Sequence, residues 1–93
     1  MSPLGRKARR RSRLRALERD IAAVWAEVLG RQAVGPEEDF LALGGNSVDA
    51  MKIVSRVEEL AGTELSIRVL LEGRTVAGMA ERVESARAGE RAR

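Results

Sequence analysis

Ser47 is the residue of this sequence whose hydroxyl is best placed for chemistry, because it follows two glycines and an asparagine and opens an apolar-periodic segment. Gly44 and Gly45 accept backbone angles that other residues avoid, and Asn46 tolerates the left-handed region. These residues predict a tight turn that leads into a helix, with Ser47 at or beside its N-cap. A serine there can also do no more than accept a hydrogen bond from a free amide of the first turn.

Several kinds of active site are excluded by composition. The sequence has no cysteine and no histidine, so it offers no disulfide, no thiolate ligand and no Ser-His-Asp triad. The residues around Ser47 also lack the second glycine of a hydrolase nucleophile elbow. The acids of residues 37–39 could chelate a metal, but directly after Pro36 they favour a short helical turn, and we assign no metal.

Residues 39–48, with the sequence DFLALGGNSV, resemble the core motif of thiolation domains, which are the peptidyl carrier proteins of nonribosomal peptide synthesis. The resemblance covers about residues 14–86. Asn46 stands where that family usually has His or Asp, and Leu41 where a second Phe is common. Further positions resemble the first and last helices of the family: Leu17, Ile21, Val24, Val28, Leu29, Gly30, Thr75, Val76 and Ala77.

The resemblance implies that Ser47 carries 4'-phosphopantetheine and that Gly44, Gly45 and Asn46 shape the loop before it. A phosphopantetheinyl transferase would move the arm from coenzyme A, and an adenylation enzyme would load an amino acid as a thioester. Condensation, tailoring or thioesterase enzymes would follow. The chain would be a carrier and not an enzyme, and a chain without cysteine must import its thiol. The amides at a helix N-terminus suit the phosphodiester.

Apolar spacing predicts an all-α fold: a small four-helix bundle of three main helices and one short helix. The first helix should run from Leu14 to Gly30, the second over residues 47–61 before Gly62, and the last from a Thr75 cap. Residues 31–46 form a long loop. Residues 66–72 suit a strand or a helix, and we choose a helix because no strand is available to pair with them.

The predicted core combines one face of each helix with three loop side chains. Its members are Leu14, Leu17, Ile21, Val24, Trp25, Val28, Val34, Phe40, Leu43, Ala50, Ile53, Val54, Val57, Leu60, Val76, Met79, Ala80 and Val83. At about 100° per residue, Val48 falls opposite the buried face of the second helix and Met51 falls at its edge. With Lys52, these side chains border Ser47, and we predict that partner enzymes contact them; the resembled family uses the residue after the serine in this way.

Positive charge is concentrated at the start of the chain. Residues 1–15 hold seven of the 17 Lys and Arg residues and none of the 14 acids, so the remainder has a net charge of 10 − 14 = −4. We predict a mobile basic arm at 1–13, a carrier domain at 14–86 and a frayed tail at 87–93. Such an arm can bind nucleic acid or another anionic surface, or can merely aid solubility. Because no recognition helix or aromatic platform accompanies it, we expect no nucleic-acid partner.

Two other functions remain open. An acyl carrier protein for polyketide or fatty acid synthesis would share the fold and the arm, and a small helical DNA-binding protein would use the basic residues instead. No apolar run is long enough to span a membrane, and we expect a cytoplasmic monomer. The chain stops soon after its last predicted helix, which favours a free-standing (type II) carrier of an antibiotic-type pathway over an excised domain.

Overall fold

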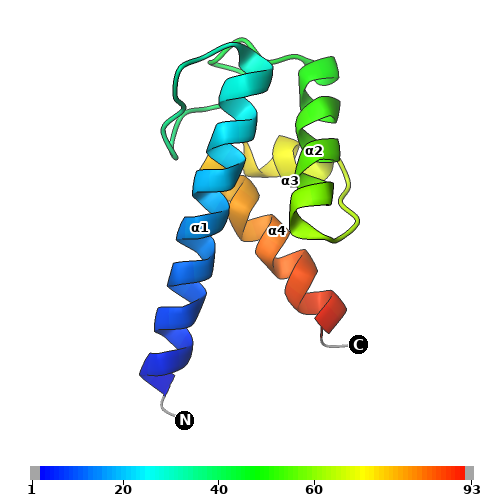
Figure 1. The fold of residues 1–93 in the computed structure, drawn as a ribbon. Helices are drawn as coiled ribbons and strands as arrows, with labels where there is room; N and C mark the ends of the chain where they lie inside the picture. The colour runs from blue at the N-terminus through cyan, green and yellow to red at the C-terminus, as the bar shows by residue number, and fades with distance from the viewer. Residues whose placement is uncertain (1–2, 92–93) are drawn as a thin grey trace.

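Four helices and one long loop make up the fold (Figure 1). The computed structural model describes residues 3–91. The helices are α1 (Pro3–Leu29), α2 (Ser47–Ala61), α3 (Arg68–Gly73) and α4 (Val76–Arg91). Over these residues there is no strand, only an isolated bridge between Asp39 and Thr75. The all-α class, with three main helices, a short one and a long loop between the first two, is confirmed.

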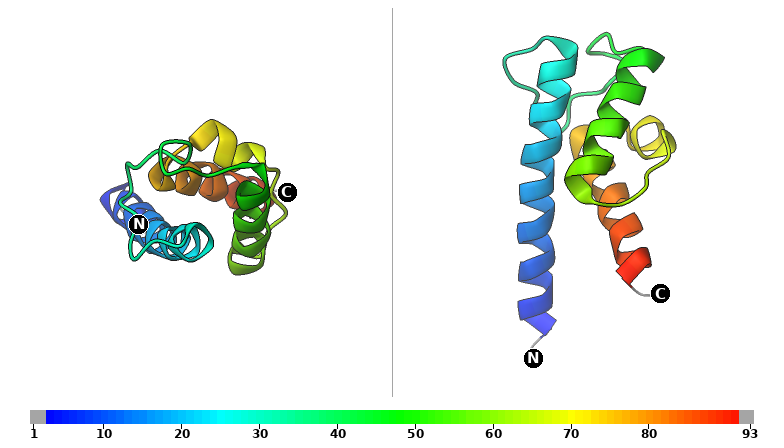
Figure 2. Two further views of the ribbon diagram at one scale, coloured as in Figure 1. Left: turned by 90° about the horizontal axis from the view of Figure 1, so that it is seen from above. Right: turned by 45° about the vertical axis from the view of Figure 1, so that its right-hand side comes forward.

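The helices pack in pairs. α4 contacts both α1 and α3, and α2 contacts the same two helices. Figure 2 shows α1 and α2 side by side, and in its view from above α3 and α4 lie together on one side of this pair. α2 begins at the end of the bundle where α1 finishes, so the N-terminus of α1 points toward the opposite end (Figure 1).

The first helix begins earlier than the sequence predicts. α1 starts at Pro3, not at Leu14, so most of the segment predicted to be a mobile arm is helical, and only its residues 1 and 2 lie outside the described residues. Proline suits a first helical position, and the Arg, Lys and Ala residues that follow are good helix formers. The predicted helix start was too late because we expected the mutual repulsion of the basic side chains to prevent helix formation there.

The repulsion is offset by acids on the last helix. Arg10 Nη2 lies 3.2 Å from Glu81 Oε2, and Arg13 Nε lies 3.2 Å from Glu84 Oε2. Glu84 is only 3% exposed, so the second pair is shielded from water on one side. These partners are 71 residues away in sequence, and helical periodicity cannot reveal them.

The last helix also runs past its predicted end. The tail predicted to fray from Arg87 is helical as far as Arg91, and residues 92 and 93 lie outside the described part. The predicted division of the chain at residues 13/14 and 86/87 stays a prediction. In the middle of the chain, the choice of helix over strand for residues 66–72 is confirmed by α3.

Most of the predicted side chains are buried in the core, Val28 and Leu43 are half-buried against it, and Leu60 is exposed. Leu60 was predicted to face inward but is 43% exposed. It lies in the last turn of α2, about 70° from the centre of the buried arc at 100° per residue, where the chain turns away at Gly62. The buried face of α2 consists of Ala50, Ile53, Val54 and Val57.

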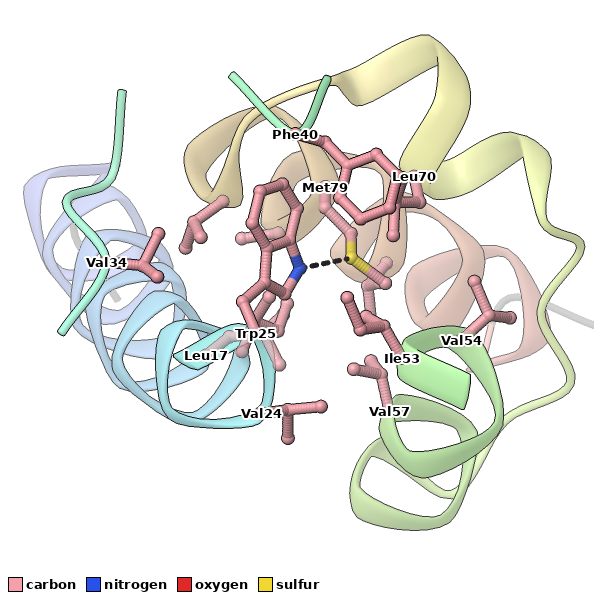
Figure 3. Close-up of a cluster of buried hydrophobic side chains, with 14 of the residues drawn as sticks. Leu17, Val24, Trp25, Val34, Phe40, Ile53, Val54, Val57, Leu70 and Met79 are labelled. Carbon is pink, nitrogen blue, oxygen red and sulfur yellow. Dashed lines mark hydrogen bonds between the residues drawn. The ribbon is translucent and has the colours of Figure 1, made fainter. Parts of the chain in front are cut away.

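Trp25 of α1 contacts both α4 and the long loop in the core (Figure 3). Its Nε1 donates to Met79 Sδ of α4 at 3.5 Å. Its ring meets the ring of Phe40 from the loop edge to face, with centroids 5.5 Å apart and planes at 76°, an arrangement that favours the ring quadrupoles. Trp25 is fully buried, as predicted for a core anchor.

The long loop over residues 31–46 is fixed to the helices by backbone hydrogen bonds. Phe40 N–H donates to Arg74 O at 2.7 Å, and Ala77 N–H donates to Pro36 O at 3.0 Å. A turn forms at residues 36–37 instead of a helical turn, and the Glu38 carboxylate accepts a 2.6 Å hydrogen bond from Gly35 N–H. The loop acids thus hold the loop's own backbone.

None of the helices in residues 3–91 combines the length and apolar content that a membrane crossing requires.

Candidate functional site

Asp39 organises the turn that leads toward Ser47. Its Oδ2 accepts hydrogen bonds from Leu41 N–H at 2.9 Å and Ala42 N–H at 3.1 Å, and its Oδ1 lies 3.0 Å from Arg74 Nε. The bond from Ala42, followed by the Arg74 guanidinium and the bond from Leu41, holds the pKa of Asp39 below its ordinary value. One carboxylate therefore closes the turn and links it to the residue after α3.

Gly44 and Gly45 are required for different structural reasons. Gly44 has φ +86°, the left-handed region predicted for this turn. Gly45 lies against the Phe40 ring so closely that a Cβ atom would overlap three ring atoms, while its N–H donates to Phe40 O at 3.1 Å. Only glycine lets the chain pass this close to the core on its way to Ser47.

Asn46 is the N-cap of α2, and it does not adopt the left-handed conformation that asparagine tolerates. Its backbone is extended, with φ −123° and ψ 179°. The Asn46 Oδ1 accepts from Asp49 N–H at 2.9 Å, and Asp49 Oδ2 accepts from Asn46 N–H at 3.3 Å, which completes a reciprocal capping box. The capping role that Ser47 could have played is therefore filled by its neighbour.

Ser47 is the first residue of α2 and is exposed. Within the described residues, its hydroxyl makes no hydrogen bond, and neither do the N–H groups of Ser47 and Val48. Free amides at a helix start favour an anion, because they combine unsatisfied donors with the positive end of the helix dipole. A phosphate ester on Ser47 Oγ fits this position.

Two exposed apolar side chains lie beside Ser47, as their helical phase predicted. Val48 is 60% exposed and Met51 is 63% exposed. They border a groove of about 560 Å³ whose other lining residues include Lys52 and, from α1, Val28. The groove is open and mostly apolar, so it can accept apolar side chains of another molecule.

A second exposed apolar pair was not anticipated. Leu41 in the loop is 61% exposed and Leu71 on α3 is 48% exposed, and both border a small hollow next to Arg74 and the Phe40 ring. The sequence shows only that Leu41 stands where the resembled family commonly has a second Phe. Its exposure follows from the Asp39 turn, which points Phe40 inward and leaves the next side chain outside.

The family of phosphopantetheine attachment sites matches residues 19–83, about 70% of the chain. The chain belongs to the phosphopantetheine-attachment family. Domains of this family carry 4'-phosphopantetheine, whose thiol supplies the chemistry that a chain without cysteine lacks.

Similar proteins narrow the type of carrier. The chain is 44% identical over 63 residues to surfactin synthase subunit 3 of Bacillus subtilis (strain 168); the match covers 68% of this chain but only 5% of that protein. BlmI, a type-II acyl-carrier protein of Streptomyces verticillus involved in bleomycin biosynthesis, is 65% identical. Its structure superposes with a TM-score of 0.81 over 90% of this chain and 96% of BlmI.

A peptidyl carrier protein solved in complex with the phosphopantetheine transferase Sfp and coenzyme A is 29% identical, with a TM-score of 0.70 over 74% of this chain and 90% of that one. Together with the synthetase relatives, these matches make the chain a peptidyl carrier protein of nonribosomal peptide synthesis. The peptidyl type, which the resemblance of residues 39–48 implied, is favoured over the acyl alternative.

Proposed function

We propose that Ser47 is the attachment residue of the phosphopantetheine arm and that Gly44, Gly45 and Asn46 hold it in position. The supporting observation is the free Ser47 hydroxyl next to two unbonded N–H groups, while Asn46 caps the helix. Attachment joins Ser47 Oγ to the phosphorus of the arm, and the bond from that phosphorus to the rest of coenzyme A breaks. The serine proton must pass to a base, and we propose that the transferase provides it, because this chain has no histidine and the Asp49 carboxylate near Ser47 is engaged in the capping box.

Three other hydroxyls, those of Ser66, Thr75 and Thr63, are less suitable. Ser66 Oγ accepts a hydrogen bond from Arg68 N–H at 3.0 Å, and Thr75 Oγ1 accepts one from Gly78 N–H at 2.9 Å. Thr63 is only 7% exposed. Each of these oxygens is therefore occupied or shielded, whereas Ser47 is neither.

Once loaded, the chain would hold an aminoacyl or peptidyl group as a thioester and present it to separate enzymes. These are a phosphopantetheinyl transferase, an adenylation enzyme, and condensation, tailoring or thioesterase enzymes. The chain itself would catalyse none of the steps. The likeness to BlmI over nearly all of that protein supports a free-standing carrier. We propose that the chain is a monomer and that it acts in the cytoplasm, where coenzyme A is available.

Val48, Met51 and Lys52 form the proposed partner surface. They are exposed side chains on the first two turns of α2, so an enzyme that reaches Ser47 must pass close to them. Leu41 and Leu71 extend the apolar surface onto the loop and α3. Scattered apolar side chains are common on proteins, but these cluster around one helix start, which supports a docking role.

Peptide mapping tests the attachment residue. The purified chain is incubated with coenzyme A and a broad-specificity transferase, and intact mass is followed by fragmentation. We expect one phosphopantetheinyl group on Ser47 and none in the Ser47→Ala variant. An arm found on Ser66 or Thr75, or a Ser47→Ala variant that is still modified, would contradict the proposal.

The partner surface is tested separately with Val48→Asp. Because Val48 is exposed, this variant should melt within about 0.5 kcal/mol of the parent, while arm transfer and aminoacyl loading both become slower. Unchanged rates would show that partners do not contact Val48. A large loss of stability would show that the side chain packs in the core.

A further inference from the structure

Three arginines on α1 lie in one row and hold no partner of their own. Arg11, Arg15 and Arg19 are each four residues apart, so they share one face of the helix, and all three are exposed. Within the described residues, none of them forms an ion pair or a side-chain hydrogen bond. The row thus differs from Arg10 and Arg13, which hold α1 to α4.

A hollow lies directly beside the row. It has a volume of about 350 Å³ and is bordered by Arg15 and Arg19 on one side and by the start of the long loop on the other. Ala22, Val34 and Pro36 provide an apolar wall, and Glu18 also borders the hollow. Unpaired positive charge therefore adjoins a mostly apolar recess.

The row lies away from the groove beside Ser47. Arg19 and Val28, which borders that groove, are nine positions apart on α1, or about 180° at 100° per residue. The family match begins at residue 19, so Arg11 and Arg15 lie ahead of the segment that the family shares. A molecule bound at the row would leave Ser47 accessible.

We propose that the arginine row and its hollow form a docking surface for an acidic, partly apolar segment of a partner protein. Successive arginines rise about 6 Å along the helix. Carboxylates on every fourth residue of a helix, or on alternate residues of a strand, have nearly the same spacing, so one segment can pair with the whole row. An apolar side chain of that segment enters the recess between Ala22 and Pro36.

Nucleic acid fits this surface less well. A phosphate backbone carries no apolar side chain that could fill the recess. Binding of single strands usually adds aromatic stacking, but Trp25 and Phe40, the only aromatic residues of the chain, are buried. The charge and the recess together select an acidic polypeptide.

Titration of the unmodified, isotope-labelled chain tests the proposal. The probes are a peptide of alternating Glu and Leu, a helical peptide with Glu at every fourth position and Leu beside it, polyglutamate of equal charge, and a short DNA duplex. We expect one of the first two peptides to bind at least about fivefold more tightly than polyglutamate or DNA at physiological salt, because only it can fill the recess. Amide shifts should map to residues 11–22 and 34–36.

Single charge reversals provide the matched control. Arg15→Glu and Arg19→Glu should each weaken binding of that peptide by about fivefold to tenfold, whereas Arg68→Glu, which reverses an exposed charge on α3, should change it by less than about twofold. Circular dichroism checks that each variant keeps its helix content. The proposal is overturned if neither mixed peptide exceeds polyglutamate, if DNA binds more tightly, if the shifts map elsewhere, or if Arg68→Glu weakens binding as much. Since the readout uses no arm, these outcomes are independent of the role of Ser47.

Discussion

Gly45→Ala should destabilise the chain through a steric conflict with one identified ring. The added methyl group would overlap the Phe40 ring, and Phe40 is buried against Trp25. The hollow beside the ring has a volume of only about 20 Å³, so it is too small to take up the displaced ring. Overpacking a dense core costs about 1–3 kcal/mol. For a domain of this size, that loss lowers the melting temperature by about 5–20 °C.

Urea denaturation followed by Trp25 fluorescence measures the effect, and Gly89→Ala is the matched control. A methyl group at Gly89 meets nothing within 4 Å in α4, so this variant should be stabilised by up to about 1 kcal/mol. Arm transfer to Ser47 should also slow in Gly45→Ala, because the loop must shift to relieve the overlap.

A double-mutant cycle identifies the ring as the cause. Phe40→Leu alone should cost about 1–3 kcal/mol. It also removes the ring atoms that the methyl group would strike, so the combined variant should lose less than the sum of the two, by at least about 0.5–1 kcal/mol. Additive losses, or a Gly45→Ala variant within about 0.5 kcal/mol of the parent, would refute the proposed close approach.

Three further variants test the contacts around the site and along α1. Asn46→Ala removes the capping box and should cost about 1 kcal/mol in thermal or urea melts; no loss would mean that another group caps α2. Arg13→Ala should cost about 1–3 kcal/mol because it deprives the buried Glu84 carboxylate of a partner, whereas Arg10→Ala, whose ion pair is exposed, should cost at most about 0.5 kcal/mol; equal losses would refute this contrast. Asp39 has a lowered folded-state pKa, so its stabilisation is complete above about pH 4 and disappears as the pH falls through that lower pKa. Asp39→Asn should flatten this acid limb in melts from pH 2 to 6, and an unchanged limb would contradict the assignment.

The helical spacing predicted most of the fold because the core depends on local periodicity. The faces of α1, α2 and α4 followed from apolar residues three and four apart, and the end of α2 followed from Gly62. Leu60 was the exception, since periodicity places a side chain on a face but does not show where neighbouring helices stop covering that face.

The features that the sequence did not predict depend on partners far along the chain. The first turns of α1 are held by Glu81 and Glu84, which no local pattern connects to Arg10 and Arg13. At the site, the sequence placed Ser47 at the helix start but could not tell which residue caps it. That distinction depends on the backbone angles of Asn46. The residue type does not reveal them, because asparagine is common both at helix N-caps and in left-handed turns.

The Phe40 ring is shared between the core and the approach to Ser47, and this would limit where a thiol travels if the arm is attached at Ser47 as proposed. The ring contacts Trp25 on one side and underlies Gly45 on the other, so an arm at Ser47 would start from a point that moves rigidly with the bundle. The volume that the thiol explores is then set by the length and flexibility of the arm alone. For a docked enzyme, the effective concentration of the carried group depends on the docking pose and the arm. A flexible loop before Ser47 would lower this effective concentration.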